Sequence, residues 1–225
     1  MINKRLIPPV YGNLYFSLRE LTREIDALLS ECSKKHKDLI LLDFGCGSKP
    51  YQTLTEKYNI KYLGADLSFI PNIDVEIDEK GTIQLADNSV DILLSSQVLE
   101  HVYDTDKYLS ECYRVLKPNG TLILTTHGHW VFHPDPNDYW RWTSQGLKKT
   151  ISKQNFDIAY FSGVMNINSV ALQYLQDNIR IKLKYKIVIT IFTYFTQCLI
   201  RLNERLSNKT NHDCGIFIVK ATKKN

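Results

Sequence analysis

Cysteine is scarce in this chain and is not arranged for cross-linking. The five cysteines form no Cys-x-x-Cys pair, and their number is odd. This pattern is typical of reduced thiols and argues against a disulfide framework or a cysteine-based zinc site. The first nine residues also lack the apolar core of a signal peptide. We therefore expect a cytoplasmic protein.

Long apolar runs, internal repeats and a strong charge are also absent. The longest nearly apolar segment, residues 187–200, has fourteen residues, whereas a helix that spans a bilayer needs about 20. The net charge of +4 is modest, and we expect no nucleic-acid partner. A chain of 225 residues can form one α/β domain with additions.

What the sequence does contain is a buried-strand pattern that runs into a glycine turn. Residues 39–44 are apolar around one acid, Asp43, and Gly45-Cys46-Gly47 follows directly. A short apolar run before glycines indicates a strand in the middle of a parallel sheet. Glycine also lets a ligand lie against the main chain. A strand, a glycine turn and a helix form the mononucleotide-binding half of a doubly wound fold.

A second strand pattern strengthens the nucleoside interpretation. Residues 61–67 end with Asp66-Leu67, and Asp66 comes 19 residues after Gly47. An acid at this distance can accept hydrogen bonds from both ribose hydroxyls; the alternative is that Asp66 only caps a loop. A third small residue is missing, because Ser48-Lys49-Pro50 stands there. Its absence makes a nicotinamide oxidoreductase a distant third interpretation.

Three ordered motifs between residues 39 and 126 resemble the class I S-adenosylmethionine-dependent methyltransferases, with a type 11-like domain. They are Asp43–Gly47, Asn88–Val102 and Glu111–Leu122. The resemblance implies a Rossmann-like, doubly wound α/β sheet of seven strands. It also implies an antiparallel last strand and S-adenosyl-L-methionine as the cofactor.

We expect a single methyltransferase domain over residues 1–225. It has a helical lead (1–38), a cofactor-binding core (39–163), a helical insert (164–213), and a last strand with a tail (214–225). Within the core, Thr143 is a predicted N-cap for a helix over residues 144–153.

The resemblance also implies the residues that bind the cofactor. Gln97, after the fourth strand, should pass under the methionine part. Asp78, at the end of a strand pattern over residues 73–78, should meet the adenine amino group, with Glu76 as the competitor. The predicted set is Asp43, Gly45, Cys46, Gly47, Asp66, Leu67, Asp78 and Gln97.

Residues 127–143 are unusually rich in side chains that carry chemistry. They hold three histidines, two acids, an arginine and three tryptophans. Zinc is one interpretation, but cysteine ligands and a helical His-x-x-x-His pair are missing, so we predict no metal. Proline and aromatic residues indicate a rigid loop over a pocket, and aromatic faces beside polar groups suit sugar rings. The segment resembles His-Pro-x-Pro-x-Asp-Tyr-x-Arg-x-Thr stretches in methyltransferases of bacterial surface-glycan (polysaccharide) biosynthesis.

Methyl transfer to a sugar hydroxyl benefits from a base, and histidine titrates near working pH. The predicted catalytic residues are His133 and His101, with Asp138 to orient a histidine or accept a substrate hydroxyl. The predicted substrate contacts are His127, Trp140 and Arg141, the last through a phosphate or carboxylate of an activated sugar. Two alternatives stay open: His101 is a structural residue, and Asp138 and Arg141 form a mutual salt bridge that pins the loop.

The positive charge is concentrated in the predicted insert. Residues 179–209 hold seven Lys/Arg and one acid, and the rest of the chain has a net charge of −2. Basic flanks around an apolar helix indicate peripheral membrane contact at the inner face, which would suit a lipid-linked glycan acceptor. The alternatives are a helical cover over the pocket and a homodimer seam.

The acceptor itself stays open at this point. A sugar, a nucleotide-sugar or a lipid-linked glycan is the first expectation. The alternatives are a lipid, a quinone or another small molecule. A non-catalytic S-adenosylmethionine-binding subunit is the alternative of a different class.

Overall fold

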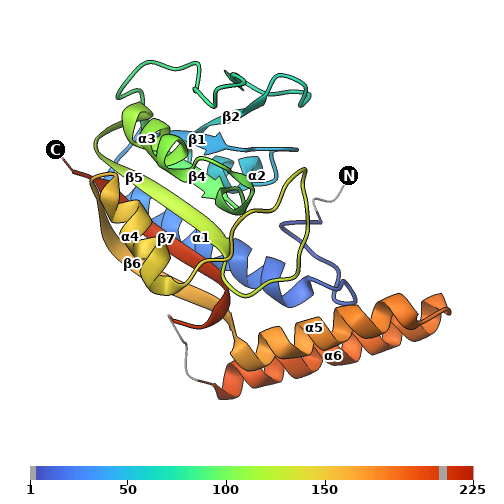
Figure 1. Cartoon of the computed structure of the whole chain (residues 1–225). Coiled ribbons are helices and arrows are strands. Elements are labelled where there is room, and N and C mark those ends of the chain that lie inside the picture. Colours follow the sequence, from blue (N-terminus) through green and yellow to red (C-terminus); the bar gives the residue numbers. More distant parts are fainter. Residues whose placement is uncertain (1–3, 208–211, 225) are drawn as a thin grey trace.

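The computed structural model describes residues 4–207 and 212–224. Seven strands form one sheet at the centre of the molecule (Figure 1). In spatial order they are β3 (Val75–Ile77), β2 (Lys61–Leu67), β1 (Ile40–Phe44), β4 (Val90–Ser96), β5 (Leu116–His127), β7 (Cys214–Lys223) and β6 (Phe156–Asn166).

The strand directions are those of the doubly wound sheet that the resemblance implies. Strands β1 to β5 pair in parallel, and β7 runs antiparallel to both of its neighbours, β5 and β6. The predicted α/β class, the seven strands and the reversed last strand are therefore confirmed. Ligands of such sheets bind outside the carboxyl ends of the strands, where the strand order reverses.

Helices cover both faces of the sheet. They are α1 (Tyr15–Lys35), α2 (Gln52–Glu56), the 3₁₀ turn η1 (Leu99–His101), α3 (Thr105–Val115), α4 (Ser144–Lys153), α5 (Ile167–Lys182) and α6 (Lys186–Leu206). Alternate residues of a strand point to opposite faces, so Leu42 packs in one apolar cluster with α3 and α4. Leu41 packs in a second cluster with α1. The core is thus two apolar layers, one on each side of the sheet.

Helix α4 begins as the sequence predicts. Thr143 has extended backbone angles, and its hydroxyl oxygen accepts a hydrogen bond from the backbone N–H of Gly146 at 3.1 Å. This contact satisfies one of the N–H groups that the first turn of a helix leaves without an intrahelical partner. The cap fixes where the loop of residues 128–143 ends.

Two strands differ in length from the sequence patterns. β6 continues to Asn166, beyond the predicted core boundary at residue 163, because Val164 and Asn166 still pair with β7. β3 keeps only three residues of the pattern over 73–78. Both differences arise from pairing with a neighbouring strand, which a local pattern does not contain.

The predicted insert is a helical hairpin of α5 and α6, which lie side by side and extend beyond the sheet (Figure 1). Lys209, one of its basic residues, lies outside the described residues, as do the start of the predicted lead and the end of the tail. Among the residues that the structure describes, no helix is long and apolar enough to cross a membrane.

Candidate active site

A cleft of about 470 Å³ opens at the carboxyl ends of β1, β2 and β4. Its volume is within the roughly 300–1,000 Å³ that is typical of small-ligand pockets. Of the eight predicted cofactor residues, only Asp78 does not line it. The seven that do are Asp43, Gly45, Cys46, Gly47, Asp66, Leu67 and Gln97. The cleft is the candidate cofactor site.

The glycine turn forms the floor of this cleft, and its two glycines have different reasons to be glycine. Gly45 has φ +80°, and a Cβ there would lie 2.6 Å from Val98 Cγ2. Gly47 has φ +50°, but a Cβ there would meet nothing within 4 Å. Gly45 is therefore required by packing under the turn. Gly47 leaves bare backbone facing the open cleft, as a ligand that lies on the main chain requires.

Asp66 lies at the end of β2, beside the turn. Its Oδ2 accepts the Gly47 N–H at 2.8 Å and its Oδ1 accepts the Leu67 N–H at 2.8 Å. These bonds hold the carboxylate still, and each oxygen keeps a second acceptor position. Leu67, Phe69 and other apolar side chains continue the wall. A rigid carboxylate that can accept hydrogen bonds from a diol, beside an apolar slot, fits a nucleoside. Asp66 also caps the loop, which was the alternative role.

Asp43 is buried beneath the turn. Burial raises the pKa of this carboxyl to about 6, although the Tyr62 hydroxyl donates a 2.6 Å hydrogen bond to Oδ2 and opposes the shift. Burial also raises the pKa of the neighbouring Cys46 thiol to about 12. Cys46 is therefore a protonated, unreactive wall residue.

Asp78 is the predicted cofactor residue that does not line the cleft. Its Oδ1 accepts the backbone N–H groups of Lys80 and Thr82, at 2.9 and 2.8 Å, and so holds the turn after β3. Ile77 and Gly81, on either side of it, line the cleft instead. The predicted contact of Asp78 with adenine stays a prediction.

Arg5, Tyr51 and Ser96 line the cleft and were missed by the sequence analysis. Arg5 Nε donates to the Tyr51 hydroxyl at 3.2 Å, and that hydroxyl lies 2.9 Å from Ser96 Oγ. The network continues through Thr125 to Gln97. Tyr51 and Ser96 are close in sequence to predicted residues, which could have indicated them. No local sequence pattern indicates Arg5, which reaches the cleft from the N-terminal segment.

On the other side of the cleft stands His101, at the end of η1. Its Nδ1 lies within hydrogen-bond distance of the Asn137 carbonyl oxygen. A carbonyl oxygen only accepts, so Nδ1 carries a proton, and in the neutral ring Nε2 is then the nitrogen with the lone pair. This tautomer is the one that a general base needs.

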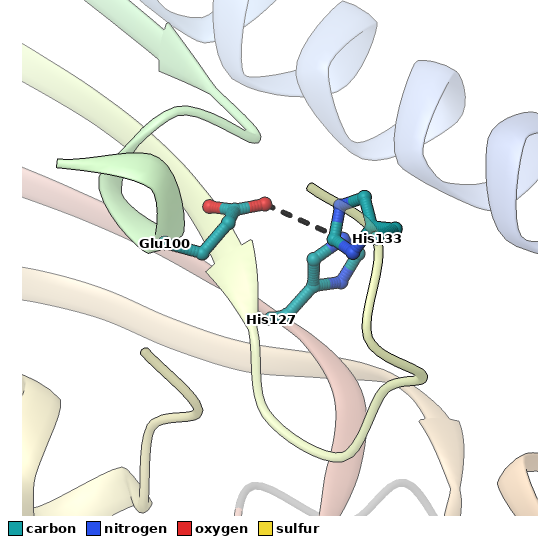
Figure 2. Close-up of side chains that lie close together, drawn as sticks. All are labelled: Glu100, His127 and His133. Atoms are coloured by element: carbon teal, nitrogen blue, oxygen red, sulfur yellow. Dashed lines mark ion pairs between the residues drawn. The ribbon is translucent and has the colours of Figure 1, made fainter. Parts of the chain in front are cut away.

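Behind His101 lies a histidine cluster, which we define as His101, His127 and His133 together with Glu100. The ring of His133 stands 5.0 Å from that of His101 and 4.8 Å from that of His127, centre to centre. Figure 2 shows Glu100, His127 and His133 converging from η1, the end of β5 and the following loop. The structure thus brings all three predicted histidines together.

Glu100 is completely buried and was not among the predicted residues. Its Oε2 accepts the Thr126 hydroxyl at 2.8 Å, and its Oε1 lies 3.3 Å from His127 Nε2. Burial raises the pKa of Glu100 and lowers that of His127 well below its usual range. Both side chains therefore favour their uncharged forms. Glu100 Oε1 and His127 Nδ1 form no hydrogen bond with any residue that the structure describes.

The cluster also has the donor set of a metal site. One ligand atom each from Glu100, His127 and His133 lies within 4.8 Å of the others. Two imidazoles and a carboxylate suit zinc or iron. The chain therefore offers a place for a divalent ion, and the expectation of no metal stays a prediction.

Asp138 and Arg141 form the loop-pinning pair that was one of the two alternatives. Two bonds of 2.6 Å join the guanidinium to both carboxylate oxygens. The remaining N–H groups of Arg141 donate to the carbonyls of Trp130, Val131 and Trp140. All five N–H donors are thus used inside the loop, so the predicted contact with substrate would require Arg141 to release one of them.

Asp138 also positions a histidine, as the sequence analysis suggested. Its Oδ2 accepts the backbone N–H of His133 at 2.9 Å and lies 3.6 Å from His133 Nδ1. Burial by itself would raise the pKa of Asp138, but Arg141 and this N–H outweigh it and hold the pKa at about 2. Burial lowers the pKa of His133.

The tryptophans support the loop in two ways. Trp130 stacks on His127 with the ring planes 9° apart. Trp140, a predicted substrate contact, donates its indole N–H to the Val102 carbonyl and is 38% exposed. Asp135 and Pro136 of the same loop line the cleft. The loop therefore forms one wall of the candidate site.

Comparison with known proteins identifies the central part of the chain. Residues 42–124, from β1 through most of β5, match the family model described as "Methyltransferase domain". A probable S-adenosylmethionine-dependent methyltransferase of Mycolicibacterium smegmatis is 29% identical over 103 residues, 42% of this chain and 40% of the relative. A ubiquinone biosynthesis O-methyltransferase of Cereibacter sphaeroides is 28% identical over 126 residues, 50% of this chain and 51% of the relative.

The aligned regions thus span 40% and 51% of these two curated relatives. Among solved structures, the Haemonchus contortus phosphoethanolamine N-methyltransferase 2 in complex with S-adenosyl-L-methionine is 15% identical, with a TM-score of 0.59. The alignment covers 99% of this chain and 60% of the Haemonchus contortus chain. These findings support a class I S-adenosylmethionine-dependent methyltransferase fold, and with it S-adenosyl-L-methionine as the cofactor.

Proposed function

We propose that this class I methyltransferase chain transfers the methyl group of S-adenosylmethionine to a hydroxyl of a sugar or glycan intermediate, with a histidine as the base. The observation that carries the proposal is the position of His101. This one side chain lines the cofactor cleft and also belongs to the histidine cluster. A base at that junction can contact an acceptor that enters between the cofactor and the loop.

The cofactor supplies a methyl group on a sulfonium, and this group transfers by direct displacement. The chain must therefore bind both molecules, align the acceptor oxygen and remove its proton. Asp66 would hold the ribose hydroxyls, and the bare backbone at Gly47 would let the ligand approach. Arg5 brings a positive charge that suits the carboxylate of the methionine part.

His101 is the base that we favour. Its Nδ1–H bond to Asn137 fixes the ring, so Nε2 can accept the hydroxyl proton. His133 is the second candidate, because its ring stands 5.0 Å from that of His101. Its Nδ1 faces both the Val131 carbonyl oxygen, an acceptor at 3.2 Å, and Arg141 Nη2, a donor at 3.4 Å. The aromatic loop that forms one wall of the cleft suits a sugar ring, whose apolar face can stack on aromatic side chains.

A quinone precursor is the second candidate acceptor. The Cereibacter sphaeroides relative favours it, because that protein is an O-methyltransferase of ubiquinone biosynthesis. A ring hydroxyl of such a molecule would need the same base and the same alignment. The two acceptors differ in polarity, so direct assay separates them.

Cofactor binding is the first test. We would titrate S-adenosylhomocysteine and NAD into the wild type, Asp66→Ala and Glu56→Ala by calorimetry. Loss of hydrogen bonds to a charged group costs about 1.5–3 kcal/mol, so we expect Asp66→Ala to weaken binding on the order of 100-fold. Glu56 is an exposed acid at the end of α2 and serves as the control. Binding of NAD alone would overturn the proposal.

Acceptor identity is the second test. Purified protein with methyl-labelled S-adenosylmethionine would be offered nucleotide-sugars, lipid-linked saccharides and quinone precursors in parallel. We expect label in a saccharide pool. Label only in the quinone pool would replace the sugar by the second acceptor. Cofactor binding with no transfer to any pool would instead favour a non-catalytic subunit.

A further inference from the structure

Helix α6 exposes an apolar face along its whole length. The exposed side chains recur every three or four residues, which places them on one side of a helix: Ile187, Ile191, Phe195, Leu199, Leu202 and Leu206. A helix of 21 residues is about 30 Å long. An amphipathic helix normally turns such a face toward the core, but α6 turns it to the outside.

The opposite face of α6 is polar and buried. Gln197 Nε2 donates to the Asn13 carbonyl at 2.9 Å, and Gln197 Oε1 accepts the Phe16 N–H at 2.9 Å. Gln173 and Gln176 of α5 also donate to the Asn13 carbonyl. Since this network ties the polar face to the start of α1, α6 cannot rotate to bury its apolar face without leaving these groups unpaired. The outward orientation is thus built into the fold.

Basic side chains border the apolar face. The described part of the hairpin beyond residue 178 contains six Lys/Arg and one acid, Glu204. Arg180 pairs with Asp177 of the same helix at 3.8 Å, and the other five are Lys182, Lys184, Lys186, Arg201 and Arg205. The Glu204 carboxylate accepts a hydrogen bond from the Asn166 N–H at 2.7 Å. Three of the lysines stand at the exposed tip where α5 meets α6. The tip also exposes Tyr185.

We propose that the outer face of α6 and the basic tip bind the surface of a bilayer that contains anionic lipids. An exposed apolar helix face with basic borders is the signature of a helix that lies in the interface. Lysines and arginines beside it attract anionic headgroups, and tyrosine favours the headgroup level. The hairpin is the part of the molecule that extends beyond the sheet (Figure 1), so it can reach a flat surface.

The charge of the hairpin favours an anionic membrane over a second copy of the chain as the partner of this face. A two-fold contact through α6 would bring the same face of both copies together. Apart from Arg180, which pairs with Asp177, five basic residues from each copy would then meet with one acid, Glu204, from each to balance them. An anionic membrane instead gains from every one of these charges. The inference does not depend on the proposed methyl transfer, because none of its residues lines the cofactor cleft.

Vesicle sedimentation tests the proposal. Neutral phosphatidylcholine vesicles would be compared with vesicles that also contain phosphatidylglycerol. We expect at least roughly tenfold more wild-type protein bound to the anionic vesicles, with the excess falling as salt rises. Ile191→Glu/Phe195→Glu should lose the binding, whereas Tyr103→Glu, an exposed aromatic on another part of the molecule, should keep it.

The charge contribution has its own pair of variants. Lys182→Glu/Lys184→Glu/Lys186→Glu should lose the preference for anionic vesicles. Lys34→Glu/Lys35→Glu/Lys37→Glu changes the same charge at the exposed end of α1 and should keep it. Unchanged melting curves and unchanged S-adenosylhomocysteine binding in all four variants would show that fold and cofactor site are intact.

Three results would overturn the proposal. The first is absence of wild-type binding to anionic vesicles, and the second is equal binding by Ile191→Glu/Phe195→Glu. The third is a dimer in sedimentation equilibrium that this variant abolishes, since the face would then belong to a second copy. A failure of S-adenosylhomocysteine binding in the wild type would count against the proposed function alone.

Discussion

The two walls of the cleft are built in different ways. The cofactor wall includes the glycine turn at the floor and Asp66, which the Gly47 N–H joins to the turn within one β-α-β unit. The loop wall consists of the histidine cluster and residues 128–143, whose side chains come from η1, β5 and the loop itself. The first wall depends on backbone geometry and the second on side-chain contacts. We therefore expect substitutions to separate binding of the cofactor from use of the acceptor.

The largest separation should come from His101→Ala. Removing a general base lowers the rate by roughly 10²–10⁴-fold, so we expect kcat to fall by that order while S-adenosylhomocysteine affinity stays within a factor of about 2 to 3. Steady-state kinetics and calorimetry on the same preparation measure both. His133→Ala is the matched comparison and should cost less.

The reverse ranking of the two variants would make His133 the base. If His133 accepts the proton, the acid limb of the pH–rate profile should lie below the ordinary histidine range near pH 6.5, because burial lowers its pKa. One equivalent of zinc or iron in the purified protein, measured by mass spectrometry, would instead make Glu100, His127 and His133 a metal centre.

A smaller effect should follow from Arg141→Lys. Lysine has three donors on one nitrogen and cannot replace the five-bond guanidinium fork, so Asp138 and three loop carbonyls lose partners. We expect the acceptor KM to rise roughly tenfold, faster proteolysis within residues 128–143, and unchanged cofactor affinity. Arg23→Lys, in an exposed pair with Glu20, is the control. Loss of cofactor binding in Arg141→Lys would show that the two walls are not independent.

The last prediction concerns the stability of the fold rather than activity, through Asp43 beneath the cofactor wall. Its folded pKa of about 6 lies above the roughly 3.9 of an unfolded aspartate. The folded state therefore holds the proton more tightly. Stability falls as pH rises from about 4 to about 6, and the cost is fully present above that range.

Asp43→Asn removes the charge and keeps an acceptor for the Tyr62 hydroxyl. At pH 7.5 we expect stabilisation on the order of 2 kcal/mol, seen as a higher Tm in scanning calorimetry, with a flatter dependence between pH 4 and 6. Asp157 is an exposed acid of β6, and Asp157→Asn should change neither the Tm at pH 7.5 nor its dependence on pH between 4 and 6. A lower Tm at pH 7.5 would contradict the assignment of a buried, costly charge.

The same contrast explains how much the sequence could predict. The glycine turn and Asp66 were predictable because their spacing is local and their geometry follows from backbone angles. The histidines and Asp138 were predictable as a group, because they lie in one unusual segment. Glu100 and Arg5 were not: one joins the cluster only when η1 packs against β5, and the other crosses from the N-terminal segment. The roles of Asp138 and Arg141 were left open, because residue types alone do not tell whether a pair closes on itself.

By itself, the sequence determined the strand pattern, the glycine turn, the acid after β2 and the cap of α4, since each follows from local periodicity and backbone preference. Only the tertiary structure decided that Asp78 holds a turn outside the cleft. It likewise decided that all five N–H groups of Arg141 donate hydrogen bonds within the loop. It also decided that α6 faces outward with its apolar side. These outcomes depend on which partners long-range packing brings within hydrogen-bond distance, and neighbours along the chain carry no record of them.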